Sequence, residues 1–200
     1  MEPFKTKNSN RSMFIAMVAI FTSLSTIATV VFVVPFPSTQ GYFNLGDTFV
    51  MLSGLLLGPI GGFIAGGTGS ALGDALLGFP AFMPITFFAK GFEGFFVGLF
   101  SSRTRLRERA SWWDVIGVLF GSAAMLTGYF LGEVFVLGVP FGVALIELVT
   151  INSVQVIMGS IFTIAIGPLL REYLRNYTYS EEEHQDWMIV TEKSPETAGV

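Results

Sequence analysis

The sequence predicts an all-α membrane protein, a six-transmembrane-helix bundle with both termini in the cytoplasm. Hydrophobic residues make up 52% of the chain and charged residues only 13%, whereas soluble domains carry about a quarter charged residues. The apolar residues form long runs, as lipid-facing helices require, and the mean hydropathy is +0.64. The basic residues gather in segments that six spans place on one side of the membrane.

The first span is expected over residues 13–34. The preceding residues 1–12 are polar and basic, and we predict that they form a cytoplasmic N-terminus. The apolar run of 22 residues is longer than a usual signal-peptide core, and no small-x-small cleavage site follows it. It is therefore interpreted as a retained helix, ended by Pro35 and Pro37.

Spans two and three are expected over residues 47–57 and 60–77. Gly58-Pro59 separates them, and proline is disfavoured inside a helix but fits its first turn. Residues 46–77 are long enough for one span and a half, or for two short, tilted spans. We predict two spans joined by a tight turn.

The last three spans are expected over residues 84–100, 115–137 and 143–170. An arginine-rich loop, residues 103–109, precedes span five, and Arg171 and Arg175 follow span six. With the N-terminus inside, six spans place all these basic residues in the cytoplasm, whereas five would separate the loop from the C-terminal arginines. Together, residues 13–170 form the predicted membrane domain. The acidic segment 171–200 is predicted to be a disordered cytoplasmic tail.

The composition argues against several functions. The chain has no cysteine and a single histidine, His184, so disulfides, cysteine-ligated zinc and a Ser/His/Asp triad are not expected. It also lacks a glycine-rich phosphate loop ending in Gly-Lys-Ser/Thr. We therefore expect no catalytic activity, no metal, no cofactor and no nucleic-acid partner.

Polar residues inside the expected spans indicate where function resides, because charge in a membrane is costly and faces a cavity or a partner. The orientation places all of them in the outer half of the membrane or near its midplane, and they describe a polar cavity open to the outside. The candidate ligand-binding residues are Asn44, Asp47, Asp74, Lys90, Glu93, Glu133, Glu147, Asn152 and Gln155.

Some of these residues have structural interpretations as well. Asp47 is equally well placed to cap the start of span two. Lys90 can form a buried ion pair with Asp74, or with Glu93 one turn away. The remaining polar residues of spans five and six have no basic partner in the spans and are the better ligand candidates, suited to a neutral or weakly cationic small molecule. Rings that can stack on a ligand are Tyr42, Phe79 and Phe82.

Small residues recur at helical spacing. Gly54, Gly58, Gly62 and Gly66 line one face, where small side chains let helix backbones approach closely in lipid. We expect most such faces to pack inside the bundle. Span one carries the same spacing and is the candidate face for a partner protein, through Ser12, Ala16, Ala19 and Ser23.

Four short motifs carry a resemblance to a known family: Asn44-Leu45-Gly46-Asp47, Leu57-Gly58-Pro59, Gly69-Ser70-Ala71-Leu72-Gly73-Asp74 and Lys90-Gly91-Phe92-Glu93-Gly94. With them, the chain resembles the substrate-capture (S) components of energy-coupling factor (ECF) vitamin transporters of bacteria and archaea. The likeness covers most of residues 12–170, and Asn152 and Gln155 are similar to the family's asparagine/glutamine element.

The resemblance implies six helices, cytoplasmic ends and high-affinity capture of a vitamin or related micronutrient from outside a prokaryotic cell membrane. It implies partners as well, a transmembrane coupling (T) protein and two cytoplasmic ATPases, and release of the substrate by toppling in the membrane. The family's Ala-x-x-x-Ala pattern in span one is replaced here by Ser12/Ala16 and Ala19/Ser23. Pyrimidine, pyridoxine, thiamine-like and riboflavin-like substrates remain open, as does a stand-alone proton-coupled transporter that uses the intramembrane carboxylates.

Overall fold

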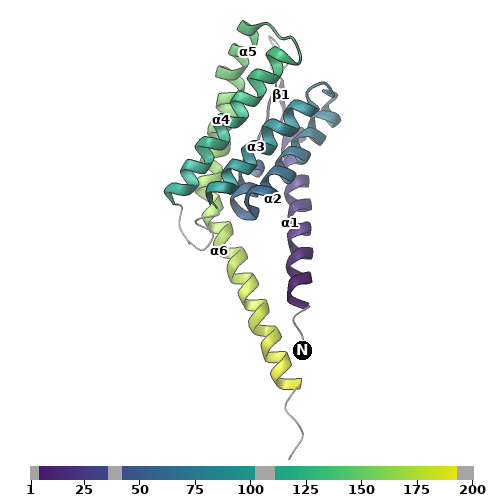
Figure 1. Ribbon diagram of the computed structural model, residues 1–200, viewed down its shortest axis with the longest axis vertical. Helices are drawn as coiled ribbons and strands as arrows, with labels where there is room; N and C mark the ends of the chain where they lie inside the picture. The colour runs from purple at the N-terminus through teal and green to yellow at the C-terminus, as the bar shows by residue number, and fades with distance from the viewer. Residues whose placement is uncertain (1–4, 36–41, 102–110, 193–200) are drawn as a thin grey trace, which may run out of the picture.

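The computed structural model (Figure 1) describes residues 5–35, 42–101 and 111–192. Within these ranges the chain is helical apart from one small antiparallel hairpin, in which Val34 pairs with Phe43. The elements in chain order are α1 (Lys5–Val31), β1 (Val34–Pro35), β2 (Tyr42–Phe43), α2 (Gly46–Leu77), α3 (Met83–Ser101), α4 (Trp112–Phe135), α5 (Phe141–Glu147), the π-helix η2 (Leu148–Asn152) and α6 (Ser153–Glu192).

Five helical stretches of the described chain are long and apolar enough to cross a membrane, which confirms the all-α membrane class. The α5, η2 and α6 elements follow one another without a break, so they form a single stretch. The expected spans two and three both fall within the stretch assigned to α2, which is interrupted at Gly58. The stretches are Arg11–Val31, Gly46–Leu77, Met83–Ser101, Trp112–Phe135 and Phe141–Leu174.

The α2 helix is interrupted at Gly58, at the position where we predicted a turn. Gly58 has φ 82° and ψ −173°, a conformation that only glycine adopts readily, and Pro59 follows it. An uninterrupted helix would hold Gly54 and Gly62 about 12 Å apart. A Cβ atom placed on Gly62 would nevertheless lie 2.6 Å from the Cα atom of Gly54.

The chain therefore folds back on itself within α2. A second contact agrees, since a Cβ atom on Gly66 would lie 2.7 Å from Cγ1 of Val50. We call residues 46–57 the N-terminal arm and residues 59–77 the C-terminal arm. The C-terminal arm ends at Gly78, which has φ 84° in a left-handed cap.

Glycine explains how closely the helices pack. A Cβ atom on Gly94 of α3 would lie 2.7 Å from the carbonyl carbon of Gly62, and one on Gly121 of α4 would lie 2.7 Å from the carbonyl oxygen of Glu93. On the other side, a Cβ atom on Gly69 would lie 2.6 Å from the carbonyl oxygen of Thr22 in α1. The glycine spacing thus serves packing within the bundle, with α2 between α1 and α3 and α4 on the far side of α3.

Different elements lie at the two ends of the helical bundle. The start of α1 and the end of α6 lie at the same, lower end in Figure 1, while the β-hairpin and α5 lie at the upper end. The α6 helix continues through residues 171–192, into the segment whose acidic composition predicted a disordered tail. Glutamate, leucine and arginine in that segment are good helix formers, which is consistent with the extension.

An apolar core lies between the helices. Its buried members come from α2, α3, α4 and α6 and include Met51, Leu55, Val97, Met125 and Val156. Buried polar side chains gather around the start of α2, the end of its C-terminal arm and the facing parts of the other helices.

Candidate ligand-binding site

A pocket opens near the upper end of the bundle, lined by residues in or next to β2, α2, α3, α4, α5, η2 and α6. The empty space between its lining atoms is about 390 Å³, which includes open solvent, and the cavity itself is about 30 Å³. Carboxyl, amide, hydroxyl and aromatic groups line it together, which is the mixture expected of a small-molecule site. The lining residues are Tyr42, Asn44, Asp74, Phe82, Thr86, Tyr129, Glu133, Glu147, Asn152 and Gln155.

The predicted polar residues fall into two groups. The first group lines the pocket and consists of Asn44, Asp74, Glu133, Glu147, Asn152 and Gln155. The second group, Asp47, Lys90 and Glu93, does not line the pocket and forms a buried cluster connected to it through Gln155.

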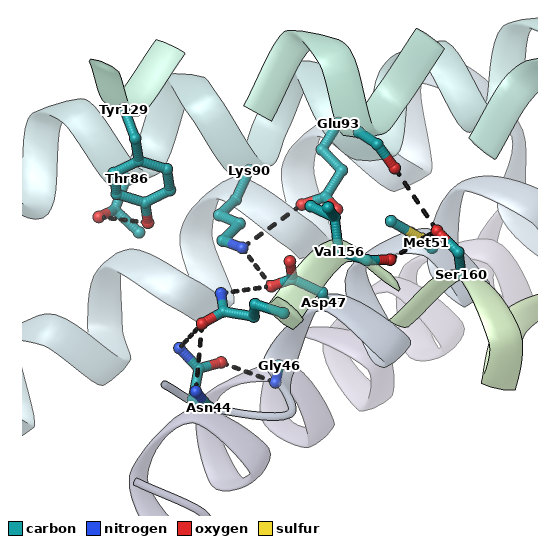
Figure 2. Close-up of polar contacts among 12 residues, drawn as sticks. Asn44, Gly46, Asp47, Met51, Thr86, Lys90, Glu93, Tyr129, Val156 and Ser160 are labelled. Atoms are coloured by element: carbon teal, nitrogen blue, oxygen red, sulfur yellow. Dashed lines mark hydrogen bonds and ion pairs between the residues drawn. The ribbon is translucent and has the colours of Figure 1, made fainter. Parts of the chain in front are cut away.

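The buried cluster is centred on Lys90, which is only 2% exposed (Figure 2). Its ammonium group forms an ion pair with Asp47, and its Nζ atom lies 3.6 Å from Oε2 of Glu93. The same Nζ atom lies 5.5 Å from the centre of the Tyr129 ring, within the range of a cation–π contact. Two carboxyl groups and an aromatic face therefore surround this buried cation.

These contacts settle the alternatives for Asp47 and Lys90. Leu45 occupies the N-cap position of α2, so Asp47 acts in an ion pair and not as the cap. Of the two alternative partners considered for Lys90, Glu93 lies within ion-pair distance and Asp74 does not. The reason is the hairpin, because the Tyr42 hydroxyl donates a hydrogen bond to Oδ1 of Asp74.

Gln155 joins the buried cluster to the wall of the pocket. Its Nε2 atom donates to Oδ1 of Asp47 over 2.9 Å. Its Oε1 atom accepts from the backbone N–H of Asn44 over 3.1 Å and faces the Asn44 amide nitrogen at 3.4 Å. The Asn44 side chain in turn accepts from the N–H of Gly46 over 2.7 Å. The segment between β2 and α2 is thereby fixed to α6 (Figure 2).

A local change of helix type brings Glu147 and Asn152 to the same pocket. Residues five apart on an α-helix point in clearly different directions. Here the helix passes through the π-helix η2, whose i to i+5 hydrogen bonding adds one residue to the turn. The Ser153 hydroxyl donates to the carbonyl oxygen of Leu148 over 2.7 Å and supports this wider turn. Single π turns of this kind are frequent at functional sites.

Several polar atoms at the pocket have no hydrogen-bond partner among the described residues. They are Oε2 of Glu133, Oδ2 of Asp74 and Nδ2 of Asn152, on side chains that are at most 8% exposed. Buried polar atoms in proteins are usually hydrogen-bonded to protein, water or ligand. The pocket therefore presents both acceptors and a donor for a polar small molecule.

Aromatic side chains cover another part of the pocket. The rings of Tyr42 and Phe79 lie 5.3 Å apart, and Phe82 meets Phe79 edge to face at 6.4 Å. Burial raises the pKa of the Tyr42 hydroxyl well above its usual range, and the charge of Asp74 raises it further. The hydroxyl therefore stays protonated and can keep donating to Asp74.

Two lining residues escaped the sequence analysis. The Tyr129 hydroxyl donates to Oγ1 of Thr86 over 2.9 Å, which links α4 to α3 across the pocket. Each residue lies four positions before a predicted polar residue, Lys90 or Glu133, and hence on the same helix face. This four-residue spacing is the sequence feature that could have identified Thr86 and Tyr129 as lining residues.

The small residues of α1 lie on the outside of the bundle. Ser12, Ala16, Ala19 and Ser23 are all exposed, so no described element covers them. The Ser23 hydroxyl donates to the carbonyl oxygen of Ala19 over 3.0 Å, which satisfies it within the helix. These four residues form an exposed strip of small side chains along α1. That this strip docks a partner protein stays a prediction.

Membrane-length helices surround a polar, partly open pocket, an arrangement typical of membrane proteins that bind small solutes. The profile of the family described as "ECF-type riboflavin transporter, S component" matches residues 9–174, so the chain belongs to this family. This confirms the resemblance inferred from the motifs. The family is a transporter component and not an enzyme.

Two further similarities agree with this assignment. The chain is 37% identical over 147 residues to an uncharacterized protein of Pyrococcus woesei, covering 74% of this chain and 94% of the relative. It is also similar in fold to the S component for biotin from an ECF-type ABC transporter. That match has a TM-score of 0.64 at 22% identity and covers 82% of this chain and 94% of the other.

Proposed function

We propose that this chain is the membrane-embedded, high-affinity substrate-capture subunit of an ECF-type importer. In this role it takes up a water-soluble vitamin or related micronutrient, while partner subunits hydrolyse ATP. The observation that carries the proposal is the polar and aromatic pocket near one end of the bundle, with buried polar atoms that have no protein partner among the described residues. Riboflavin is a candidate from the family description, beside pyrimidine, pyridoxine and thiamine-like compounds.

The pocket is proposed to face the outside of a prokaryotic cell, with both termini in the cytoplasm. In this arrangement the two arms of α2 enter and leave the membrane as a hairpin, which makes six passes. The proposal is supported by the location of the start of α1 and the end of α6 at the end opposite the β-hairpin (Figure 1). The basic residues near both ends of the membrane domain favour the same orientation.

The predicted site residues take two roles in this proposal. The pocket-lining residues Asn44, Asp74, Glu133, Glu147, Asn152 and Gln155 contact the ligand. Asp47, Lys90 and Glu93 hold the helices that carry them. The distinction is supported by the pocket lining and by the burial of the Lys90 cluster behind Gln155.

The partners are proposed to be a transmembrane coupling protein and two cytoplasmic ATPases. The exposed small residues of α1, Ser12, Ala16, Ala19 and Ser23, form the docking face for the coupling protein. Small side chains allow two helices to approach closely in lipid, which supports this choice. The rest of the outer apolar surface contacts lipid.

Reconstitution in liposomes tests this proposal against a stand-alone, proton-coupled transporter. The buried carboxylates near Lys90 favour the alternative, because intramembrane acids can relay protons. We expect the purified chain to retain a small molecule, and uptake to require ATP and the partner subunits. Uptake by the chain alone, driven by a proton gradient, would establish the alternative.

A further inference from the structure

The charges around the pocket are one-sided. Three carboxyl groups line it, from Asp74, Glu133 and Glu147, and its described lining contains no lysine, arginine or histidine. The nearest buried cation, Lys90, already pairs with Asp47 and contacts Glu93 behind the pocket. The wall is thus acidic without a basic side chain to compensate it.

The carboxyl groups are not equivalent. Asp74 accepts a hydrogen bond from the Tyr42 hydroxyl. Glu133 and Glu147 extend from α4 and α5, and both line the pocket. They are 2% and 4% exposed, and Oε2 of Glu133 has no hydrogen-bond partner among the described residues. Two buried carboxyl groups that line one pocket favour a ligand that brings a positive charge or strong hydrogen-bond donors.

Aromatic groups lie on the same pocket. Tyr42 and Phe82 belong to its lining, and so does Tyr129. Ring faces stack on planar ligands and also attract cations. The acidic pair and the rings therefore select for the same kind of molecule, a planar ring that carries positive charge.

We propose that the ligand is an aromatic or heteroaromatic cation, whose positive nitrogen lies between Glu133 and Glu147 and whose ring packs against Tyr42 and Phe82. This inference rests on the proposed capture function and names its substrate class. It also separates the chain from its structural neighbour for biotin, because a ligand carboxylate here would face three carboxyl groups.

The test is a charge series on the purified full chain in detergent. Isothermal titration measures binding of thiamine, which carries a fixed positive charge, neutral riboflavin and anionic biotin. The variants are Glu133→Gln and Glu147→Gln, which keep side-chain size. Glu172→Gln on the partly exposed part of α6 is the control for loss of one negative charge. Thermal unfolding verifies that each variant is folded.

We expect thiamine to bind tightest, and each pocket variant to weaken thiamine binding by roughly tenfold or more while riboflavin binding changes far less. The control should match the wild type. Mass spectrometry of the co-purifying molecule should find an aromatic cation, which reports the charge independently of the probes.

Three outcomes overturn the inference. A neutral or anionic co-purifying vitamin would overturn the charge assignment while leaving the capture function intact. Equal loss of thiamine and riboflavin binding in both variants would do the same. If no small molecule binds or co-purifies, both the inference and the proposed function fail.

Discussion

Replacement of Lys90 by methionine should strongly destabilise the bundle. Lys90 Nζ lies 3.6 Å from Oε2 of Glu93 and also pairs with Asp47. At an effective dielectric constant of about 20, one such pair of charges attracts by about 5 kcal/mol. Desolvation offsets part of this attraction, but removal of the cation alone leaves two carboxyl groups buried without their basic partner. Loss of one partner from a buried ion pair typically costs about 3–5 kcal/mol.

The assay is thermal unfolding of the purified chain in detergent. For a chain of 200 residues, such a loss should lower Tm by roughly 6–20 °C. The matched control is Glu93→Gln, which keeps the shape of the side chain and leaves the ion pair between Lys90 and Asp47 in place. It should cost less than Lys90→Met, because it also removes the desolvation cost of Glu93 and leaves no buried charge without a partner.

Two outcomes of the comparison between Lys90→Met and Glu93→Gln would contradict this reasoning. If Lys90→Met unfolds within about 2 °C of the wild type, the ammonium group does not compensate buried carboxylates, and our description of the cluster is wrong. A loss in Glu93→Gln as large as that in Lys90→Met would contradict the same reasoning.

Three further substitutions separate packing, docking and binding. Gly94→Ala should lower the free energy of unfolding by about 1–3 kcal/mol, because the new Cβ atom meets the Gly62 backbone. Gly142→Ala should be neutral, because nothing lies within 4 Å of its Cβ position, and equal stability of the two variants would refute this packing argument. Ala16→Trp should leave ligand retention intact and abolish ATP-driven uptake with partners, so normal uptake would exclude α1 as the docking face. Arg171→Met should lower Tm by breaking its buried 2.9 Å ion pair to α4, without loss of ligand retention; an unchanged Tm would show that this ion pair contributes little.

Much of the fold follows from local features of the sequence. Apolar runs located the membrane-length helices, and Gly58-Pro59 located the interruption in α2, because proline and a glycine with positive φ each leave a local signature. The glycine spacing predicted close packing. What the spacing could not indicate is which helices these glycines bring together.

The site was less accessible to sequence reasoning. Polar residues inside apolar runs identified the right region, but ion-pair partners depend on which helix faces are brought together. Lys90 therefore reaches Asp47 and Glu93, while the hairpin residue Tyr42 contacts Asp74. No local sequence pattern predicts the π turn at residues 148–152. The sequence therefore could not show that Glu147 and Asn152 line the same pocket.

The central claim is that the pocket near the β-hairpin holds a small molecule. Native mass spectrometry of the purified full chain tests it most directly, with Asn152→Ala as the variant because Nδ2 of Asn152 lines the pocket without a protein partner among the described residues. We expect a bound small molecule in the wild type and its loss in the variant at unchanged Tm. Equal retention by wild type, Asn152→Ala and Glu147→Gln would contradict it.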